Sequence, residues 1–197
     1  MVFPNLQNTN KFAYDDYGAY INALAVILPT DDKFLVAILN SKLIWYFLTN
    51  ICVVRNGGYI EVKPQYFEQI PIPEVSEDEA IKLTRLTDDL ISDTMNNRKI
   101  KTKLLNLLKN KFGKVTITKK LDNWFDFSFS DLYKELKKQK ISLTLSEESE
   151  WMEFFEVQVK VYSELKTNIQ NLEKEIDRII YELYGLTEEE IKIVERG

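Results

Sequence analysis

Hydrophobic residues change their spacing along the first third of the chain, which predicts a small mixed α/β fold. Residues 20–28 form a continuous apolar and β-prone run, the pattern of a buried strand. From residue 34 to residue 47 apolar side chains recur at steps of three and four, which predicts a single helix with a broad core-facing stripe. Thr30 is the expected cap of this helix and Asp31 its expected first residue.

A predicted β-hairpin follows this helix. Residues 52–55 and 59–62 have the composition of short strands, and Asn56-Gly57-Gly58 between them tolerates the positive φ angles of a tight turn. Pro64 suits the start of a short helical turn that ends near residue 68. The prolines of residues 70–73 require an extended backbone, which closes the first part of the chain.

The rest of the chain has the spacing of long helices. Residues 77–112 and 147–184 predict two helices, each about 50 Å long at 1.5 Å per residue. The second of them places its apolar side chains at alternating steps of three and four over four heptads, the pattern of a coiled-coil seam. The seam consists of Phe155, Gln158, Tyr162, Leu165, Ile169, Leu172, Ile176, Ile179 and Leu183.

Helix start and stop residues complete the predicted elements. Gly113 and Gly185 are the expected ends of the two long helices. Ser130 is the expected cap of a short helix at 131–139, and Ser146 is expected to open the last long helix. Thr187 and Glu190 have the spacing of a capping box for a short C-terminal helix.

Together these elements predict an α+β fold that is mainly helical. A small mixed α/β head at 1–73 precedes a helical stalk at 74–197, in which a hairpin cap at about 113–146 joins the two long helices. We expect these helices to pack antiparallel within one chain. A parallel homodimer through the heptad seam is the alternative.

Composition excludes several kinds of site. The 197 residues include no histidine and a single cysteine, Cys52, so histidine-based catalysis, histidine metal ligation and a disulfide framework are excluded. The longest strongly apolar run, at 21–28, is too short to span a membrane, and no signal peptide is visible. We therefore expect a cytoplasmic protein without a membrane partner.

Charge is distributed unevenly along the chain. The net charge is −5, yet residues 94–121 contain no acidic residue and nine cations. These are Arg98, Lys99, Lys101, Lys103, Lys109, Lys111, Lys114, Lys119 and Lys120. A block of one sign inside an acidic protein favours a surface for a polyanion. The alternative is a solvated helix face that pairs with acidic residues across the helix hairpin.

An ordered set of short motifs resembles a known family. The motifs are Leu39-Asn40-Ser41-Lys42-Leu43, Gly57-Gly58-Tyr59, Gln65-Tyr66-Phe67-Glu68-Gln69-Ile70-Pro71-Ile72-Pro73, Glu175-Ile176-Asp177 and Tyr181-Glu182-Leu183-Tyr184-Gly185-Leu186-Thr187. In this order they resemble the TaqI-like C-terminal specificity domain of DNA-modifying enzymes. The resemblance extends over almost the whole chain.

The resemblance implies a target-recognition and spacer fragment of a type IIG restriction–modification enzyme. Its expected partners are double-stranded DNA and the methyltransferase and nuclease domains of the parent protein. The parent is expected to be an adenine-N6 methyltransferase that uses S-adenosylmethionine, with Mg²⁺ for cleavage. This chain contains no Asn-Pro-Pro-Tyr-type motif and no glycine-rich loop after a strand, so we expect neither catalysis nor a cofactor or metal site within it.

Recognition of a base sequence needs donors and acceptors that reach base edges, and cations that hold phosphates. Candidates for DNA contact are Asn10, Lys11, Lys42, Arg55, Asn56, Tyr59, Lys63 and Gln65. Candidates for contact with phosphate or with the parental catalytic domain are Lys109, Lys111, Lys114, Lys119 and Lys120. The alternative for residues 55–58 is an ordinary hairpin turn, and for Lys42 it is a lysine on a helix surface.

Two other functions compete with DNA recognition. A non-catalytic helical module for protein interaction or dimerisation would explain the heptad seam and the acidic isoelectric point, near 5.0. A metal-dependent nuclease would explain Asp31 or Asp32 followed by Glu61-Val62-Lys63, because two acids can hold Mg²⁺ beside a lysine. Glu-x-Lys is common by chance, so we rank the nuclease last.

Overall fold

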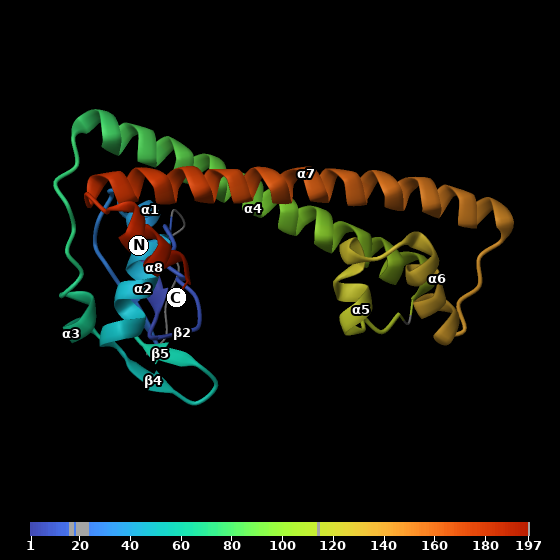
Figure 1. Ribbon diagram of the computed structural model, residues 1–197. Coiled ribbons are helices and arrows are strands. Elements are labelled where there is room, and N and C mark those ends of the chain that lie inside the picture. The colour runs from blue at the N-terminus through green and yellow to red at the C-terminus, as the bar shows by residue number, and fades with distance from the viewer. Residues whose placement is uncertain (16–17, 19–23, 114, 197) are drawn as a thin grey trace. The chain divides into compact units, whose positions relative to one another are not determined.

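The computed structural model describes residues 1–15, 18, 24–113 and 115–196 of the chain (Figure 1). The fold is α+β and mainly helical, as predicted. It divides into a first unit, Met1–Leu90 with Leu172–Gly197, and a second unit, Ile91–Asn171. The long helices α4 (Glu77–Phe112) and α7 (Leu145–Leu183) each contribute residues to both units, so the units group residues that are distant in sequence.

The first unit contains two small antiparallel sheets. Strand β1 (Val2–Pro4) pairs with β3 (Ala25–Ile27), and β2 (Leu6–Gln7) extends the hairpin of β4 (Val53–Arg55) and β5 (Tyr59–Glu61). The hairpin was predicted, whereas β1 and β2 were not. Of the strand predicted at 20–28, residues 20–23 lie outside the described residues and β3 occupies part of the remainder.

The helix predicted over 34–47 is wrong as a single element, because the structure contains two helices. Helices α1 (Phe34–Asn40) and α2 (Lys42–Ile51) are bent by 56° at Ser41. Ser41 has an extended backbone, and its hydroxyl accepts a hydrogen bond from the Ile44 N–H at 3.3 Å, so it caps α2. The first helix begins at Phe34 rather than Asp31, since the Thr30 hydroxyl accepts the Asp32 N–H in a local turn instead.

One hydrophobic core joins the sheets and helices of the first unit. Phe3 of β1 packs its ring 4.8 Å from the ring of Phe12 and 5.0 Å from that of Phe67 on α3 (Pro64–Phe67). The two long helices add buried side chains to this core, among them Leu83 from α4 and Ile180 from α7. The short helix α8 (Glu188–Arg196) packs beside α2. It begins with the predicted Thr187–Glu190 capping box.

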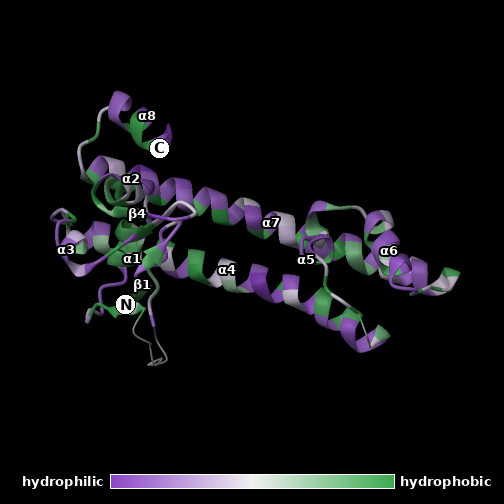
Figure 2. Cartoon of the chain, turned by 90° about the horizontal axis from the view of Figure 1, so that it is seen from below, coloured by the Kyte–Doolittle hydropathy of each residue, from purple (hydrophilic) through white to green (hydrophobic). Residues whose placement is uncertain are grey.

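The second unit has a separate core. The end of α4 and the start of α7 enclose α5 (Lys119–Asp122), a 3₁₀ turn at Trp124–Asp126 and α6 (Phe129–Lys138). The buried side chains include Leu104, Leu108, Trp124, Leu121, Leu136 and Phe155. Residues 115–117 form a loop. In Figure 2 both long helices show hydrophobic and hydrophilic stretches in alternation, as amphipathic helices do.

Two predicted caps are wrong by two residues. Ser128, not Ser130, caps α6, because its hydroxyl accepts the Asp131 N–H at 3.2 Å. Thr144, not Ser146, opens α7 by forming a reciprocal pair of hydrogen bonds with Glu147. Both glycine stops are confirmed, with φ of 67° at Gly113 and 64° at Gly185.

Within each unit the two long helices run antiparallel. In the first unit, Lys82 of α4 lies 3.5 Å from Glu175 of α7. In the second unit, Asn168 donates to Asp93, and Lys111 lies 3.0 Å from Glu147. The residue numbers on α7 therefore decrease in the direction in which those on α4 increase. Among the described residues, no single helix is both long enough and apolar enough to span a membrane.

Candidate nucleic-acid interface

The β4–β5 hairpin presents an exposed polar turn at one end of the first unit (Figure 1). All three residues of β4 are exposed, and Arg55 pairs with Tyr59 across the hairpin. Gly57 and Gly58 have φ of 79° and 76°, which other residues rarely adopt. The glycines therefore set a turn that projects Asn56 and the ends of both strands toward solvent.

Glu61 organises the charges of the hairpin. The Arg55 Nε donates to its carboxylate at 2.9 Å, the Arg55 Nη2 donates to the same oxygen, and the Lys63 Nζ lies 3.5 Å from the other oxygen. These hydrogen bonds and positive charges lower the pKa of Glu61 below its ordinary value. One carboxylate thus orients two cations whose side chains stay about half exposed, and the cluster keeps a net positive charge.

Apolar and amide side chains surround this cluster. Tyr59 is 38% exposed and Val54 is 64% exposed, so the hairpin presents hydrophobic surface beside its cations. Gln65 lies exposed on α3, directly after the strand that carries Glu61. The structure therefore brings Arg55, Asn56, Tyr59, Lys63 and Gln65, five of the predicted DNA contacts, onto the hairpin and the turn after it. The sequence analysis missed Glu61 and Val54 as parts of this surface.

Asn10 and Lys11 have local partners in the N-terminal loop. The Asn10 side chain donates to the Ser41 carbonyl at 2.8 Å, and its own oxygen is buried. The Lys11 Nζ donates to the Asn8 side chain at 2.6 Å. Asn10 therefore ties the loop to the junction of α1 and α2, whereas Lys11 stays exposed at the surface. Their contact with DNA stays a prediction.

Lys42 lies at the first turn of α2 and faces two carboxylates. Its Nζ is 3.3 Å from Glu195 and 3.9 Å from Asp177, and its N–H donates to Asp177 at 3.0 Å. Burial raises the pKa of Asp177 above its ordinary value, although the bonds to Lys42 oppose this. Lys42 therefore holds α2 against α7 and α8. This agrees with the alternative interpretation, in which Lys42 is a lysine on a helix surface.

Replacement of Asp177 by alanine is expected to destabilise the first unit by about 1–3 kcal/mol, because the Lys42 N–H loses its acceptor. Asp177→Asn keeps an acceptor and serves as the matched control.

Since the pKa of Asp177 is raised in the folded state, its protonation favours folding, and that contribution is lost as pH rises through the folded pKa. Wild type should therefore gain stability relative to Asp177→Asn as pH falls from 7 toward about 4. Urea titrations at several pH values measure this, and a gap that is independent of pH would contradict it.

The predicted phosphate contacts separate into different environments in the second unit. Lys111 pairs with Glu147, and Lys120 lies 3.8 Å from Asp131 and 4.7 Å from the centroid of the Phe127 ring. Lys109 and Lys119 are exposed. Lys114 lies outside the described residues. The complementary pairing across the helices, the alternative interpretation of this block, thus holds for Lys111 in particular.

Nothing in the described residues assembles a metal centre. No three acidic or cysteine side chains lie close enough there to hold an ion, and the carboxylate of Glu61 is engaged by Arg55 and Lys63. Cys52 is buried, which raises the pKa of its thiol to about 11 and keeps it protonated. The arrangement at the hairpin is suited to binding through hydrogen bonds and charge.

The first unit thus presents an exposed hairpin with two cations held by one carboxylate. In comparison with protein families, residues 1–72 match the TaqI-like C-terminal specificity domain, which confirms the predicted resemblance for this part of the chain. The motifs at 175–177 and 181–187 lie outside this match. Residues 76–180 match the family described as domain of unknown function DUF8810, and the chain belongs to that family. Neither a curated protein nor a solved structure gives a significant match.

Proposed function

We propose that this chain recognises the DNA target of a restriction–modification system, and that the β4–β5 hairpin reads the bases. The observation that carries the proposal is the match of residues 1–72 to a specificity domain, in which the exposed hairpin concentrates five candidate DNA contacts. The major groove of B-DNA admits a two-stranded β-ribbon. Arg55 can form two hydrogen bonds to guanine, and Asn56 or Gln65 can form two to adenine.

Glu61 prepares Arg55 for this task. A guanidinium that is held by a carboxylate loses less conformational freedom when it binds a base. The same carboxylate repels phosphate, so it favours contacts in which Arg55 reaches a base edge over contacts with the backbone. Lys63 has a longer contact with Glu61, 3.5 Å, and a flexible, half-exposed side chain, so it can turn away from the carboxylate to hold a phosphate and fix the register of the hairpin.

The chemistry belongs to separate domains in this proposal. An adenine-N6 methyltransferase that binds S-adenosylmethionine, and a nuclease that binds Mg²⁺, would act at the site that this chain selects. The parent would then be of the type IIG class, with the chain itself non-catalytic. A purely structural dimerisation module has less support, since seam residues such as Phe155 and Ile176 are buried within the chain's own cores.

The test begins with selection of bound sequences from a random duplex library by the full chain. Replacement of Arg55 by alanine is expected to weaken binding to the selected sequence about 10- to 100-fold, the cost of one bidentate base contact, and to relax selection at one base pair. Binding to unselected DNA should change little. Arg178→Ala is the matched control, because Arg178 is also an exposed arginine paired with a glutamate, Glu182.

The same experiment can refute the proposal. Enrichment of no sequence by the wild-type chain, alone or with a methyltransferase domain that it binds, would overturn DNA recognition. A selected sequence whose binding is equally insensitive to Arg55→Ala and Arg178→Ala would leave DNA recognition in place but remove the hairpin as its reader.

A further inference from the structure

Seven of the nine cations of residues 94–121 fall into two groups in the structure. Of the other two, Lys119 is exposed on α5 and Lys114 lies outside the described residues. Three of the seven pair with acids inside the second unit: Lys101 with Asp122 at 2.8 Å, Lys111 with Glu147 at 3.0 Å and Lys120 with Asp131 at 3.8 Å. In the part of the chain that the structure describes, no ion pair joins an acid to Arg98, Lys99, Lys103 or Lys109. All four of these residues are exposed.

The four unpaired cations share one broad side of α4. Steps of three, four and seven residues place them on that side with three neutral hydrogen-bonding residues, Thr102, Asn106 and Asn110. Leu104 and Leu108, on the opposite side of the helix, are fully buried in the core of the second unit. We call Arg98, Lys99, Thr102, Lys103, Asn106, Lys109 and Asn110 the outer stripe.

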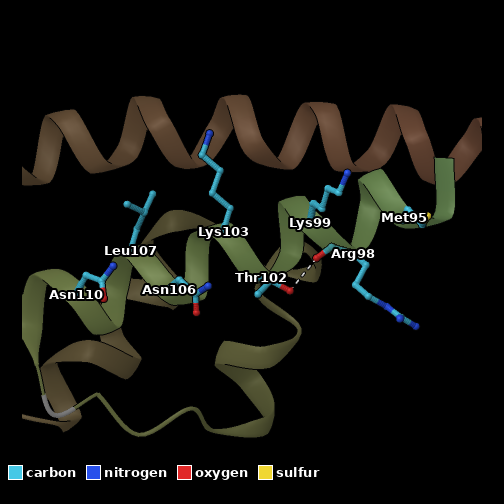
Figure 3. Close-up of a pocket in the computed structure, with 8 residues that line it drawn as sticks. All are labelled: Met95, Arg98, Lys99, Thr102, Lys103, Asn106, Leu107 and Asn110. Atoms are coloured by element: carbon cyan, nitrogen blue, oxygen red, sulfur yellow. Dashed lines mark hydrogen bonds between the residues drawn. The ribbon is translucent and has the colours of Figure 1, made fainter. Parts of the chain in front are cut away.

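A shallow open groove of about 610 Å³ follows the outer stripe, and Met95 and Leu107 also line it (Figure 3). In Figure 3 the side chains are spaced along the helix, and Arg98 and Lys103 leave it in different directions. The Thr102 hydroxyl donates to the Arg98 carbonyl at 2.8 Å, as it commonly does within a helix. The Lys103 ammonium lies 5.8 Å from the centroid of the Phe154 ring.

We propose that the outer stripe binds the phosphate backbone of DNA. Its charged members are all cations, the amides of Asn106 and Asn110 can donate hydrogen bonds, and it contains no carboxylate that would repel phosphate. From Arg98 to Lys109 the helix advances about 16 Å, a length over which one DNA strand presents about five phosphates. The inference rests on the proposal that the chain acts on DNA, and adds a second, sequence-independent contact surface in the DUF8810 region.

The composition of the stripe distinguishes DNA from an acidic protein as its partner. The centre of a protein interface is normally apolar and poor in lysine. Here six of the eight residues that line the groove are polar or charged, two of them are lysines, and only Met95 and Leu107 are apolar. Contacts of this kind fix the position of a module on the duplex but carry no sequence information.

The test neutralises the stripe in the full chain. Replacement of Arg98, Lys99, Lys103 and Lys109 by glutamine should reduce the dependence of log K on log salt by about 3–4, and should weaken binding about 100- to 1000-fold at 0.1 M salt. Selected and unselected duplexes should be affected alike. The matched control replaces four other exposed lysines, Lys160, Lys166, Lys174 and Lys192, which changes the net charge equally. Fluorescence anisotropy between 50 and 200 mM salt measures the slopes, and circular dichroism checks helicity.

The outcomes separate this inference from the proposed function. If the stripe variant and the control variant have the same slope while wild type still selects a sequence, DNA recognition holds and the stripe is not its phosphate contact. If the stripe variant keeps its DNA slope but no longer binds a methyltransferase domain, the partner is an acidic protein surface and the inference is overturned. A second variant, with Arg98→Lys and the three lysines changed to arginine, keeps the charges and should restore the wild-type slope.

Discussion

Replacing Trp124 by alanine is expected to destabilise the second unit by about 3–5 kcal/mol, the range for removing a large buried aromatic side chain. Trp124 is 1% exposed, and its ring centroid lies 5.6 Å from that of Phe155 and 5.8 Å from that of Tyr162. Its indole N–H donates to the Lys101 carbonyl at 3.3 Å. The substitution therefore leaves a large cavity at the point where the 3₁₀ turn packs against both long helices.

Hydrogen exchange by unit measures this effect, because the two units have separate cores. Amides of the second unit, such as those near Leu136, should lose most of their protection, while amides near Leu48 in the first unit keep more of theirs. Trp124→Phe preserves much of the ring packing and is the control. Equal loss of protection in both units would show that they unfold together, and a loss below about 1 kcal/mol would contradict the expected role of Trp124.

The long helices were predictable from the sequence because local and tertiary preferences agree along them. Helix α4 begins and ends at the predicted residues, since Ser76 and Glu79 cap its start and Gly113 ends it. The break at Ser41 was not predictable from the hydrophobic spacing, which continues through it. A distant contact stabilises the break: the Asn40 side chain donates to the carbonyl of Phe12, 28 residues earlier.

The two misplaced caps show a local rule that the sequence did contain. In each case the expected cap is a serine beside the apolar run, whereas the structure uses the hydroxyl residue three positions before an acid. The structure selects Ser128, three residues before Asp131, and Thr144, three residues before Glu147. Reciprocal hydrogen bonds favour this spacing over proximity to the apolar run.

The candidate site was predictable in part. Gly57 and Gly58 predict the turn at residues 56–58. Because turns lie at the surface, these glycines also predict that the residues around it are exposed. The pairing of Arg55 with Glu61 depends on the register of the strands, and the pairing of Lys101 with Asp122 on how the second unit folds. The sequence therefore predicts a basic block on α4 but cannot separate its paired cations from its unpaired ones.

Replacement of Phe3 by alanine is expected to cost about 3–5 kcal/mol in the first unit. Phe3 is 1% exposed and stacks on Phe67, which lies on α3 two residues after Gln65. Loss of the Phe3 ring removes one side of the packing that holds α3 and the end of the β4–β5 hairpin. Selective DNA binding should therefore fall together with stability, although Phe3 itself contacts no base in the proposal.

The outer stripe lies in the second unit, so the loss of the Phe3 ring should leave its binding to DNA intact. The second unit keeps its own core in Phe3→Ala, so binding to unselected DNA and its salt slope should stay near the wild-type values while the preference for the selected sequence is lost. Phe3→Leu, with a smaller change in volume, should lose about 1–1.5 kcal/mol and keep most of the preference. Chemical denaturation and anisotropy titrations on the same samples test both parts. An equal loss of selected and unselected binding would show that the hairpin and the outer stripe do not act separately. Unchanged selectivity in a destabilised Phe3→Ala protein would show that α3 and the hairpin do not read the bases.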